Sequence, residues 1–244
     1  MAQVLVIPDL HLKPWVFDRA DRILASGQAD FAVQLGDLVD DWGQLKNVGL
    51  YNETMERAYK FHKAHPSTLW CLGNHDADYH NPYAPVSSGH STLAEVDMKE
   101  WGKKLEKIGA GPRVIHIVDN VIFTHAGLTE SWLAYLSSLY MGYDYPQDDE
   151  TLIRLVNLAA PNDFFMESSP IWARPQVDEQ RVPYCHRGCL QVVGHTPVVQ
   201  AEEIDGLLST DTFSTKRDGT PIGNQKFVII DTKTKEWHYA EENN

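Results

Sequence analysis

The strongest constraint on the fold is an alternation of short apolar runs and amphipathic stretches in the first third of the chain. The apolar runs cover residues 4–7, 31–35 and 68–72, and apolar residues recur with helical spacing in residues 13–27 and 51–65 between them. Short continuous apolar runs of this kind predict strands that are buried on both faces. Strand, helix, strand, helix, strand is the pattern of βαβ units, so we expect an α/β fold with a parallel central sheet.

The rest of the chain predicts further strands and helices. Residues 79–89, which are rich in Pro, Ser, Asn, Tyr and Gly, predict a surface loop, and residues 93–108 predict a helix. Two apolar runs, 114–118 and 121–124, predict a hairpin. We expect later strands at 190–193, near 207–208 and at 226–230, with 236–239 as a hairpin partner. Residues 130–185 contain helical pieces broken by prolines, and we interpret them as an insertion or cap on a single domain of residues 1–244.

Side chains that bind metal ions follow five of the predicted strands. They are Asp9 and His11, Asp37 and Asp40, Asn74 and His75, His125, and His195. In an open α/β sheet the ligand site lies at the carboxyl ends of the strands, so these side chains can converge on one crevice. Carboxylate and imidazole ligands together suit Mn, Fe, Zn or Ni better than Ca.

The number of candidate ligands favours two metal ions over one. Two Asp, one Asn and three His exceed what one tetrahedral zinc ion requires. Asp37 has two carboxylate oxygens and is therefore the candidate bridge between ions about 3.5 to 4 Å apart, as in two-metal hydrolytic sites.

Composition limits the classes of partner. The 244 residues include 21 Lys and Arg against 34 Asp and Glu, and the resulting net charge of -13 makes nucleic acid an unlikely partner. A bound metal can reverse the field locally, so a phosphate substrate remains compatible with this charge. No apolar run approaches the roughly 18 residues that span a bilayer, and the N-terminus lacks the features of a signal peptide. Three cysteines suit a reducing compartment, so we expect a cytoplasmic protein with no membrane partner; the oligomeric state is left open.

Five ordered motifs resemble those of the calcineurin-like metallophosphoesterases. They are Asp9-Leu10-His11, Gly36-Asp37-Leu38-Val39-Asp40, Gly73-Asn74-His75-Asp76, Thr124-His125-Ala126-Gly127 and Gly194-His195-Thr196-Pro197. The segments Ile171-Trp172-Ala173-Arg174 and Thr210-Asp211-Thr212 further resemble the bacteriophage and bacterial serine/threonine-type phosphatases and their diadenosine-tetraphosphatase relatives. The resemblance implies a four-layer α/β/β/α sandwich of two mixed β-sheets flanked by helices. It also implies hydrolysis of a phosphate ester by a hydroxide that bridges two divalent ions, with manganese favoured over iron, zinc or nickel.

The resemblance implies a role for each motif residue. The first metal would be bound by Asp9, His11 and Asp37, and the second by Asp37, Asn74, His125 and His195. His75 would donate a proton to the leaving-group oxygen with Asp40 orienting its imidazole, a task that suits a group titrating near neutrality. Arg174 would bind the phosphoryl oxygens, since a planar guanidinium matches their geometry.

One departure from the family pattern leaves the substrate open. Asp41 stands where phosphatases of this branch place a second phosphate-binding Arg, and Lys13, Lys46 and Arg187 are the candidate replacements. Trp42, just past the second motif, is a candidate for the pocket wall. The substrate could be a small molecule, a nucleotide or a phosphoprotein. A phosphodiesterase or dinucleoside-polyphosphate hydrolase is the nearest alternative, and a non-catalytic interaction module on the same fold is a remote one.

Overall fold

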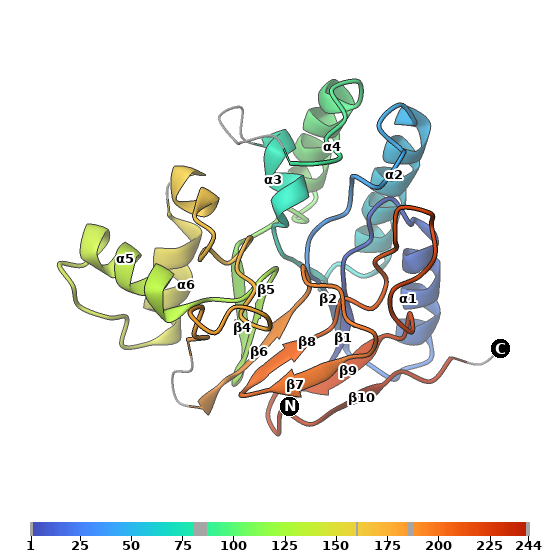
Figure 1. Ribbon diagram of the computed structural model, residues 1–244. Coiled ribbons are helices and arrows are strands. Elements are labelled where there is room, and N and C mark those ends of the chain that lie inside the picture. Colours follow the sequence, from blue (N-terminus) through green and yellow to red (C-terminus); the bar gives the residue numbers. More distant parts are fainter. Residues whose placement is uncertain (1, 81–86, 160, 185–187, 243–244) are drawn as a thin grey trace.

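Two five-stranded β-sheets pack face to face, and helices cover the outer face of each sheet (Figure 1). This computed structural model describes residues 2–80, 87–159, 161–184 and 188–242. The strand order is β10-β9-β1-β2-β3 in the first sheet and β4-β5-β6-β8-β7 in the second. The expected four-layer α/β/β/α sandwich with two mixed sheets is therefore confirmed.

The first sheet is built from the alternating elements at the start of the chain. Its strands β1 (Gln3–Ile7), β2 (Phe31–Gln34) and β3 (Leu69–Trp70) are parallel. Strand β9 (Val228–Asp231) runs antiparallel to β1, and β10 (Trp237–Tyr239) runs antiparallel to β9. Helices α1 (Trp15–Ala25), α2 (Val48–Ala64) and α4 (Glu95–Lys107) lie on the outer side of this sheet (Figure 1).

The second sheet contains the predicted hairpin of β4 (Ile115–Val118) and β5 (Val121–Thr124). Strands β6 (Leu190–Val193) and β8 (Leu207–Ser209) extend it in parallel with β5, and β7 (Glu202–Ile204) closes the edge antiparallel to β8. Between β5 and β6 the chain forms α5 (Glu130–Tyr140), α6 (Asp149–Asn157) and the 3₁₀ turn η1 (Pro161–Phe165). Thr129 and Asp148 cap α5 and α6, because their side chains accept backbone N–H groups of the first turn.

The core is divided into three layers by the two sheets. In β1, Leu5 and Ile7 face the helices of the first sheet, whereas Val4 and Val6 face the second sheet and pack with residues such as Phe123. This alternation follows the period of two of a β-strand. A third layer, which includes the fully buried Trp132, lies between the second sheet and helices α5 and α6. Both faces of β1 are thus buried, as its unbroken apolar run predicted.

Two local differences from the sequence-based expectations stand out. Strand β7 was not expected, since its residues Glu202, Glu203 and Ile204 are exposed at the sheet edge and show no apolar run. The third motif begins helix α3 (Asn74–His80) and so extends into the first residues of the expected loop, much of which lies outside the described residues. Within the described part of the chain, no helix is long and apolar enough to cross a lipid bilayer.

Candidate active site

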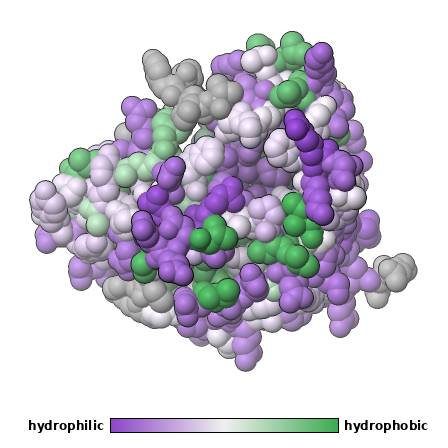
Figure 2. Space-filling model, viewed as in Figure 1, coloured by the Kyte–Doolittle hydropathy of each residue, from purple (hydrophilic) through white to green (hydrophobic). Residues whose placement is uncertain are grey.

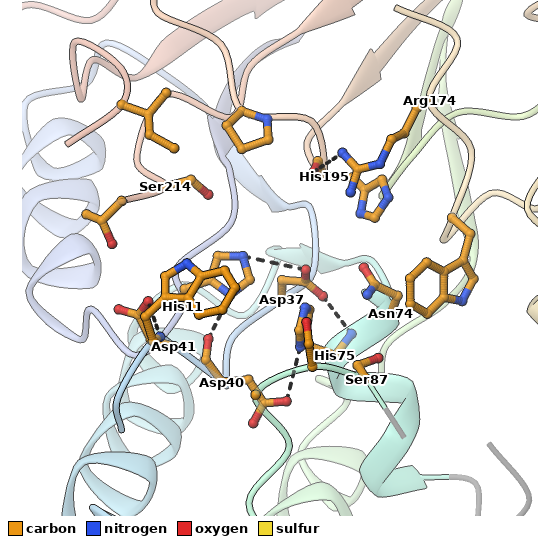
Figure 3. Close-up of a pocket in the computed structure, with 17 residues that line it drawn as sticks. His11, Asp37, Asp40, Asp41, Asn74, His75, Ser87, Arg174, His195 and Ser214 are labelled. Carbon is orange, nitrogen blue, oxygen red and sulfur yellow. Dashed lines mark hydrogen bonds and ion pairs between the residues drawn. The ribbon is translucent and has the colours of Figure 1, made fainter. Parts of the chain in front are cut away.

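The functional residues follow six parallel strands, three from each sheet. Asp9, Asp37 and Asn74 follow β1, β2 and β3, and His125, His195 and Asp211 follow β5, β6 and β8. Asp37, Asn74 and His195 line a cavity of about 330 Å³, which is drawn in Figure 3, and Asp9 and His125 are buried in contact with His195. The space-filling view shows a hollow near the centre of this face, where hydrophilic residues gather (Figure 2). All six predicted metal ligands, together with His75 and Asp40, are therefore brought to one place.

The loops that carry these residues adopt unusual backbone conformations. His11, Asp37, Asp40 and His195 have φ values of 45°, 54°, 63° and 62°, in the left-handed region that non-glycine residues seldom occupy. Such conformations persist only where the surrounding structure enforces them, and they are common at functional sites. The turns are thus shaped to direct these four side chains.

Asp37 is held at the centre of the site by backbone hydrogen bonds. The carboxylate of Asp76 accepts the N–H groups of Asp37 at 2.7 Å and Leu38 at 3.0 Å, which fixes the turn after β2. The Asp37 Oδ1 atom accepts the N–H of His75 at 3.0 Å. Burial by itself would raise the pKa of Asp37, but His125 and the other nearby imidazoles hold it well below its ordinary value. Asp37 is therefore an anion with its Oδ2 atom directed at the imidazoles.

Four potential ligand atoms face one another around His125. Its Nδ1 donates to the main-chain oxygen of Leu35 at 2.8 Å, so its Nε2 faces the other three atoms. Burial lowers the pKa of His125, but Asp37 and Asp9 outweigh that effect and raise it to about 9, so binding of a metal ion through Nε2 would release a proton. This Nε2 lies 3.0 Å from Asn74 Oδ1, 3.1 Å from His195 Nδ1 and 3.3 Å from Asp37 Oδ2. With His125 neutral and the His195 proton on Nε2, all four atoms direct lone pairs at a common centre, where a cation would offset the mutual repulsion of these lone pairs. This donor set fits a transition-metal ion.

A second group of ligand atoms lies on the other side of Asp37. His11 Nδ1 donates to the main-chain oxygen of Asp40 at 2.8 Å, so its Nε2 points toward Asp37 Oδ2 at 3.7 Å and Asp9 Oδ2 at 3.8 Å. Asp9 is buried, and burial together with the neighbouring Asp211 raises its pKa well above the ordinary value. A divalent ion would remove this unfavourable crowding of carboxylates. The two groups of ligand atoms share Asp37, so the residues present fit two ions.

His75 lies close to the second group, beside His11, but is bonded differently. Its ligand atom is within 4.8 Å of those of His11 and Asp37. However, its Nδ1 donates to Asp40 Oδ2 at 3.1 Å. Burial lowers the pKa of His75, but Asp37 and Asp40 outweigh that effect and raise it to about 9. The arrangement favours a protonated imidazole.

Two tyrosines that the sequence did not single out fix Asp40. The Asp40 Oδ1 atom accepts the hydroxyl groups of Tyr51 at 2.8 Å and Tyr79 at 2.6 Å. Burial and then the charge of Asp40 raise the pKa of both phenols, so they remain donors. In the sequence Tyr51 begins an expected helical stretch and Tyr79 begins the expected surface loop 79–89, and no pattern there distinguishes either residue as a partner of Asp40.

The expected phosphate-binding arginine also lies at the cavity. Arg174 Nη1 donates to the main-chain oxygen of His195 and to Thr196 Oγ1, both at 3.2 Å. Figure 3 shows Arg174 and His195 on one side of the pocket and His11, Asp40 and Asp41 on the other.

Two of the three candidate replacements for the missing arginine, Lys13 and Lys46, belong to the described residues, and neither lies free at the cavity. Lys13 is buried, donates to the main-chain oxygens of Leu10 and His11, and pairs with Asp41 Oδ2 at 3.4 Å. Lys46 is exposed and is not among the residues that line the cavity, and Arg187 lies outside the described residues.

The family is established by comparison of the sequence with family models. Residues 2–211 match the model of the calcineurin-like phosphoesterases, so the chain belongs to this family and is a metal-binding phosphoester hydrolase. No curated protein matches the chain.

Several solved structures align with nearly the whole chain. A cold-active protein tyrosine phosphatase mutant aligns with a TM-score of 0.51 and 15% identity over 99% of this chain and 81% of that one. A metallophosphoesterase from Sphaerobacter thermophilus gives a TM-score of 0.46 and 15% identity over 99% and 89% of the two chains. A serine/threonine phosphatase from Saccharomyces cerevisiae gives a TM-score of 0.47 and 14% identity over 99% of this chain and 80% of that one.

Proposed function

We propose that this chain is a phosphomonoesterase that uses two divalent metal ions, manganese in preference to iron, zinc or nickel. The proposal is supported chiefly by the two groups of ligand atoms that share the buried Asp37. Asp9, His11 and Asp37 would hold one ion, and Asp37, Asn74, His125 and His195 the other. When bound, two such ions supply positive charge for the phosphoryl oxygens and lower the pKa of water at the site.

His75 acts in this proposal as the general acid. Because Nδ1 donates to Asp40, the second proton of the imidazolium is on Nε2 and is available to a substrate. The oxygen of an attacking water molecule, which has given up a proton to solvent, bonds to phosphorus. The electron pair of the breaking P–O bond passes to the leaving-group oxygen, which takes the Nε2 proton. Asp40 holds the ring in position and is itself held by the hydroxyls of Tyr51 and Tyr79.

Arg174 binds the phosphoryl group opposite the carboxylates. Its guanidinium lies beside His195 and is supported by two acceptors that both use Nη1, so its other N–H groups remain for a substrate. A planar set of donors suits the tetrahedral phosphate and the charge that develops on it.

A second candidate function is hydrolysis of phosphodiesters or dinucleoside polyphosphates. It is favoured by Asp41, whose carboxylate lines the cavity where a cation would attract a dianionic monoester. This carboxylate repels a dianionic monoester more strongly than a monoanionic diester. The pairing of Asp41 with Lys13 reduces this repulsion, which is why we place the monoesterase first.

A substrate and metal panel tests the proposal. The panel comprises p-nitrophenyl phosphate, bis(p-nitrophenyl) phosphate, a phosphoserine peptide and a dinucleoside tetraphosphate, each assayed with Mn, Ni, Zn and Mg. We expect the highest kcat/KM on monoesters with Mn and loss of activity in chelator. Higher kcat/KM on the diester would reverse the order of the two candidates, and full activity of metal-free protein would contradict both.

A further inference from the structure

We propose that Arg217 and Trp42 form an outer anion-binding subsite that selects phosphate esters with a second anionic group on the leaving group. This inference rests on the proposed function, because it assumes that the scissile phosphoryl group lies between Asp37 and Arg174.

The cavity is larger than the scissile phosphoryl group requires. Its volume is about 330 Å³, whereas a water molecule takes up about 30 Å³ of liquid. Cavities of roughly 300 to 1,000 Å³ hold organic ligands. The leaving group of a substrate therefore fits inside the cavity, next to its walls.

One wall of this cavity is the loop between β8 and β9, which is fixed to the site. Ser214 Oγ donates to Asp211 Oδ2 at 2.7 Å, directly below the metal-binding region. Further out, Thr215 pairs with Pro221, and Lys216 N–H donates to Thr220 O at 2.8 Å, so the loop forms a narrow hairpin. Ser214, Thr215 and Ile222 line the cavity. Arg217 is therefore held at the tip of a braced hairpin beside the cavity.

The guanidinium of Arg217 lies over the ring of Trp42, which is on the neighbouring wall. The guanidinium carbon lies 5.6 Å from the centroid of the Trp42 ring, a distance typical of cation–π contact. Trp42 lines the cavity, yet 49% of its surface is exposed. A guanidinium in contact with an aromatic ring can still donate its N–H groups to an anion.

The charge of Arg217 is not used elsewhere in the described part of the chain. The arginines there that form ion pairs are Arg19, Arg57 and Arg181. The nearest acidic wall residue, Asp41, is already engaged, since its carboxylate accepts the N–H of Trp42 at 2.7 Å and pairs with Lys13. An anion near Trp42 therefore meets an unpaired arginine beside a neutralised carboxylate.

The substrate class that follows is a phosphate monoester whose leaving group carries a second phosphate or a carboxylate a few atoms away. Arg174 serves the scissile phosphoryl group, and Arg217 serves the second anion. A leaving group without a second anion would still be hydrolysed, because Arg217 makes no contact with the reacting atoms.

Alkanediol phosphates test this subsite with nearly constant leaving-group chemistry. We would compare kcat/KM for HO–(CH2)n–phosphate and phosphate–(CH2)n–phosphate with n from 3 to 6, at fixed free metal concentration, after correction for the two equivalent phosphates. An ω-phosphoalkanoate series replaces the second phosphate by a carboxylate. We expect a preference of about tenfold for the doubly anionic substrate at one or two chain lengths, which falls as salt is raised.

Variants assign the preference to the two residues. Arg217→Met should abolish it and leave kcat/KM for the singly phosphorylated alcohol within about twofold, whereas Arg217→Lys should retain part of it. Trp42→Phe should retain more of it than Trp42→Ala, because an aromatic ring still supports the guanidinium. Lys233→Met is the control for net charge, since Lys233 follows β9 at the end of the first sheet opposite the site.

Two results would overturn the subsite. One is equal kcat/KM for singly and doubly anionic substrates at every chain length, and the other is a preference that Arg217→Met leaves unchanged. In either case metal-dependent hydrolysis of the singly phosphorylated alcohols would still support the monoesterase. If the wild type did not hydrolyse the singly phosphorylated alcohols at all, the proposed function itself would be rejected.

Discussion

Asp40 uses two different atoms to set the proton positions of two histidines. Its main-chain oxygen accepts from His11 Nδ1, which leaves His11 Nε2 free to bind a metal. Its carboxylate accepts from His75 Nδ1, which would orient His75 for its proposed role as proton donor. The positive φ of Asp40 turns the main-chain oxygen and the carboxylate toward these two rings. We infer that one residue in a strained turn separates a ligand role from an acid role.

The role of His75 is tested by its dependence on the leaving group. An alkoxide leaving group needs a proton as the bond breaks, whereas p-nitrophenolate, with a pKa of about 7, can depart without one. His75→Asn should therefore retain its metals, lose on the order of a hundredfold on an alkyl phosphate and lose much less on p-nitrophenyl phosphate. The measurement is kcat/KM against leaving-group pKa for both proteins, with metal content determined in parallel. Parallel plots, or loss of a metal from the variant, would show that His75 is not the acid.

The two tyrosines predict a weaker form of the same defect. Tyr51→Phe leaves the buried carboxylate of Asp40 with one donor fewer, and we expect the free energy of unfolding to fall by about 1 to 3 kcal/mol. Activity on an alkyl phosphate should fall several-fold, more than activity on p-nitrophenyl phosphate, because His75 is less well positioned. Denaturant unfolding and the two kcat/KM values check this. An equal fall on both substrates would mean that Tyr51 has only a structural role.

Arg174 is expected to contribute to phosphate binding and not to the metals. Arg174→Ala should lower kcat/KM for a monoester by one to three powers of ten, about 1.5 to 4 kcal/mol, with unchanged metal content. Arg181→Ala is the matched control, because Arg181 pairs with Glu167 and Asp178. An unchanged kcat/KM for Arg174→Ala would assign phosphate binding to another residue.

At the scale of elements, the turns after β2 and β3 touch through their glycines. A Cβ atom added to Gly73 would lie 2.2 Å from the backbone nitrogen of Asp37, so only glycine allows this approach. Gly73→Ala should therefore displace the Asp37 turn, lower the melting temperature and reduce metal content together. Gly49→Ala in α2 is the control, because the nearest atom to its new Cβ is 3.8 Å away and alanine favours helix. Normal metal binding by Gly73→Ala would contradict this account of the turns.

Elements that bury a run of apolar residues could be predicted from the sequence. Elements without such a run could not. Strands β1 and β2 and the β4–β5 hairpin follow from their apolar runs. Strand β7 pairs with β8 and its side chains are exposed, so its sequence shows no hydrophobic pattern. Helix α3 is too short for a periodic pattern and begins at the motif itself.

At the scale of the whole molecule, the site is made by two sheets whose pairing the sequence pattern does not determine. His125 and His195 come together because β5 and β6 pair in parallel across a long intervening segment. Strand ends identified these two candidate ligands, and the Thr210-Asp211-Thr212 segment singled out Asp211 by resemblance, but Tyr51 and Arg217 became visible only when the sheets and the β8–β9 loop were placed. The interpretation of residues 130–185 as a cap on a single domain stays a prediction.

The proposed role of Asp37 is to bind both metal ions with one carboxylate, and the number of metal ions bound per chain is the measurement that tests it. We predict two manganese ions per chain for the wild type by elemental analysis after equilibration with Mn and removal of free metal. Asp37→Asn should bind fewer than two and lose nearly all turnover, because it removes a negative charge that both ions share. Asn74→Ala, which removes a ligand of one group only, should weaken one ion and leave the other. Two tightly bound ions and near-normal turnover in Asp37→Asn would show that the two ions do not depend on Asp37.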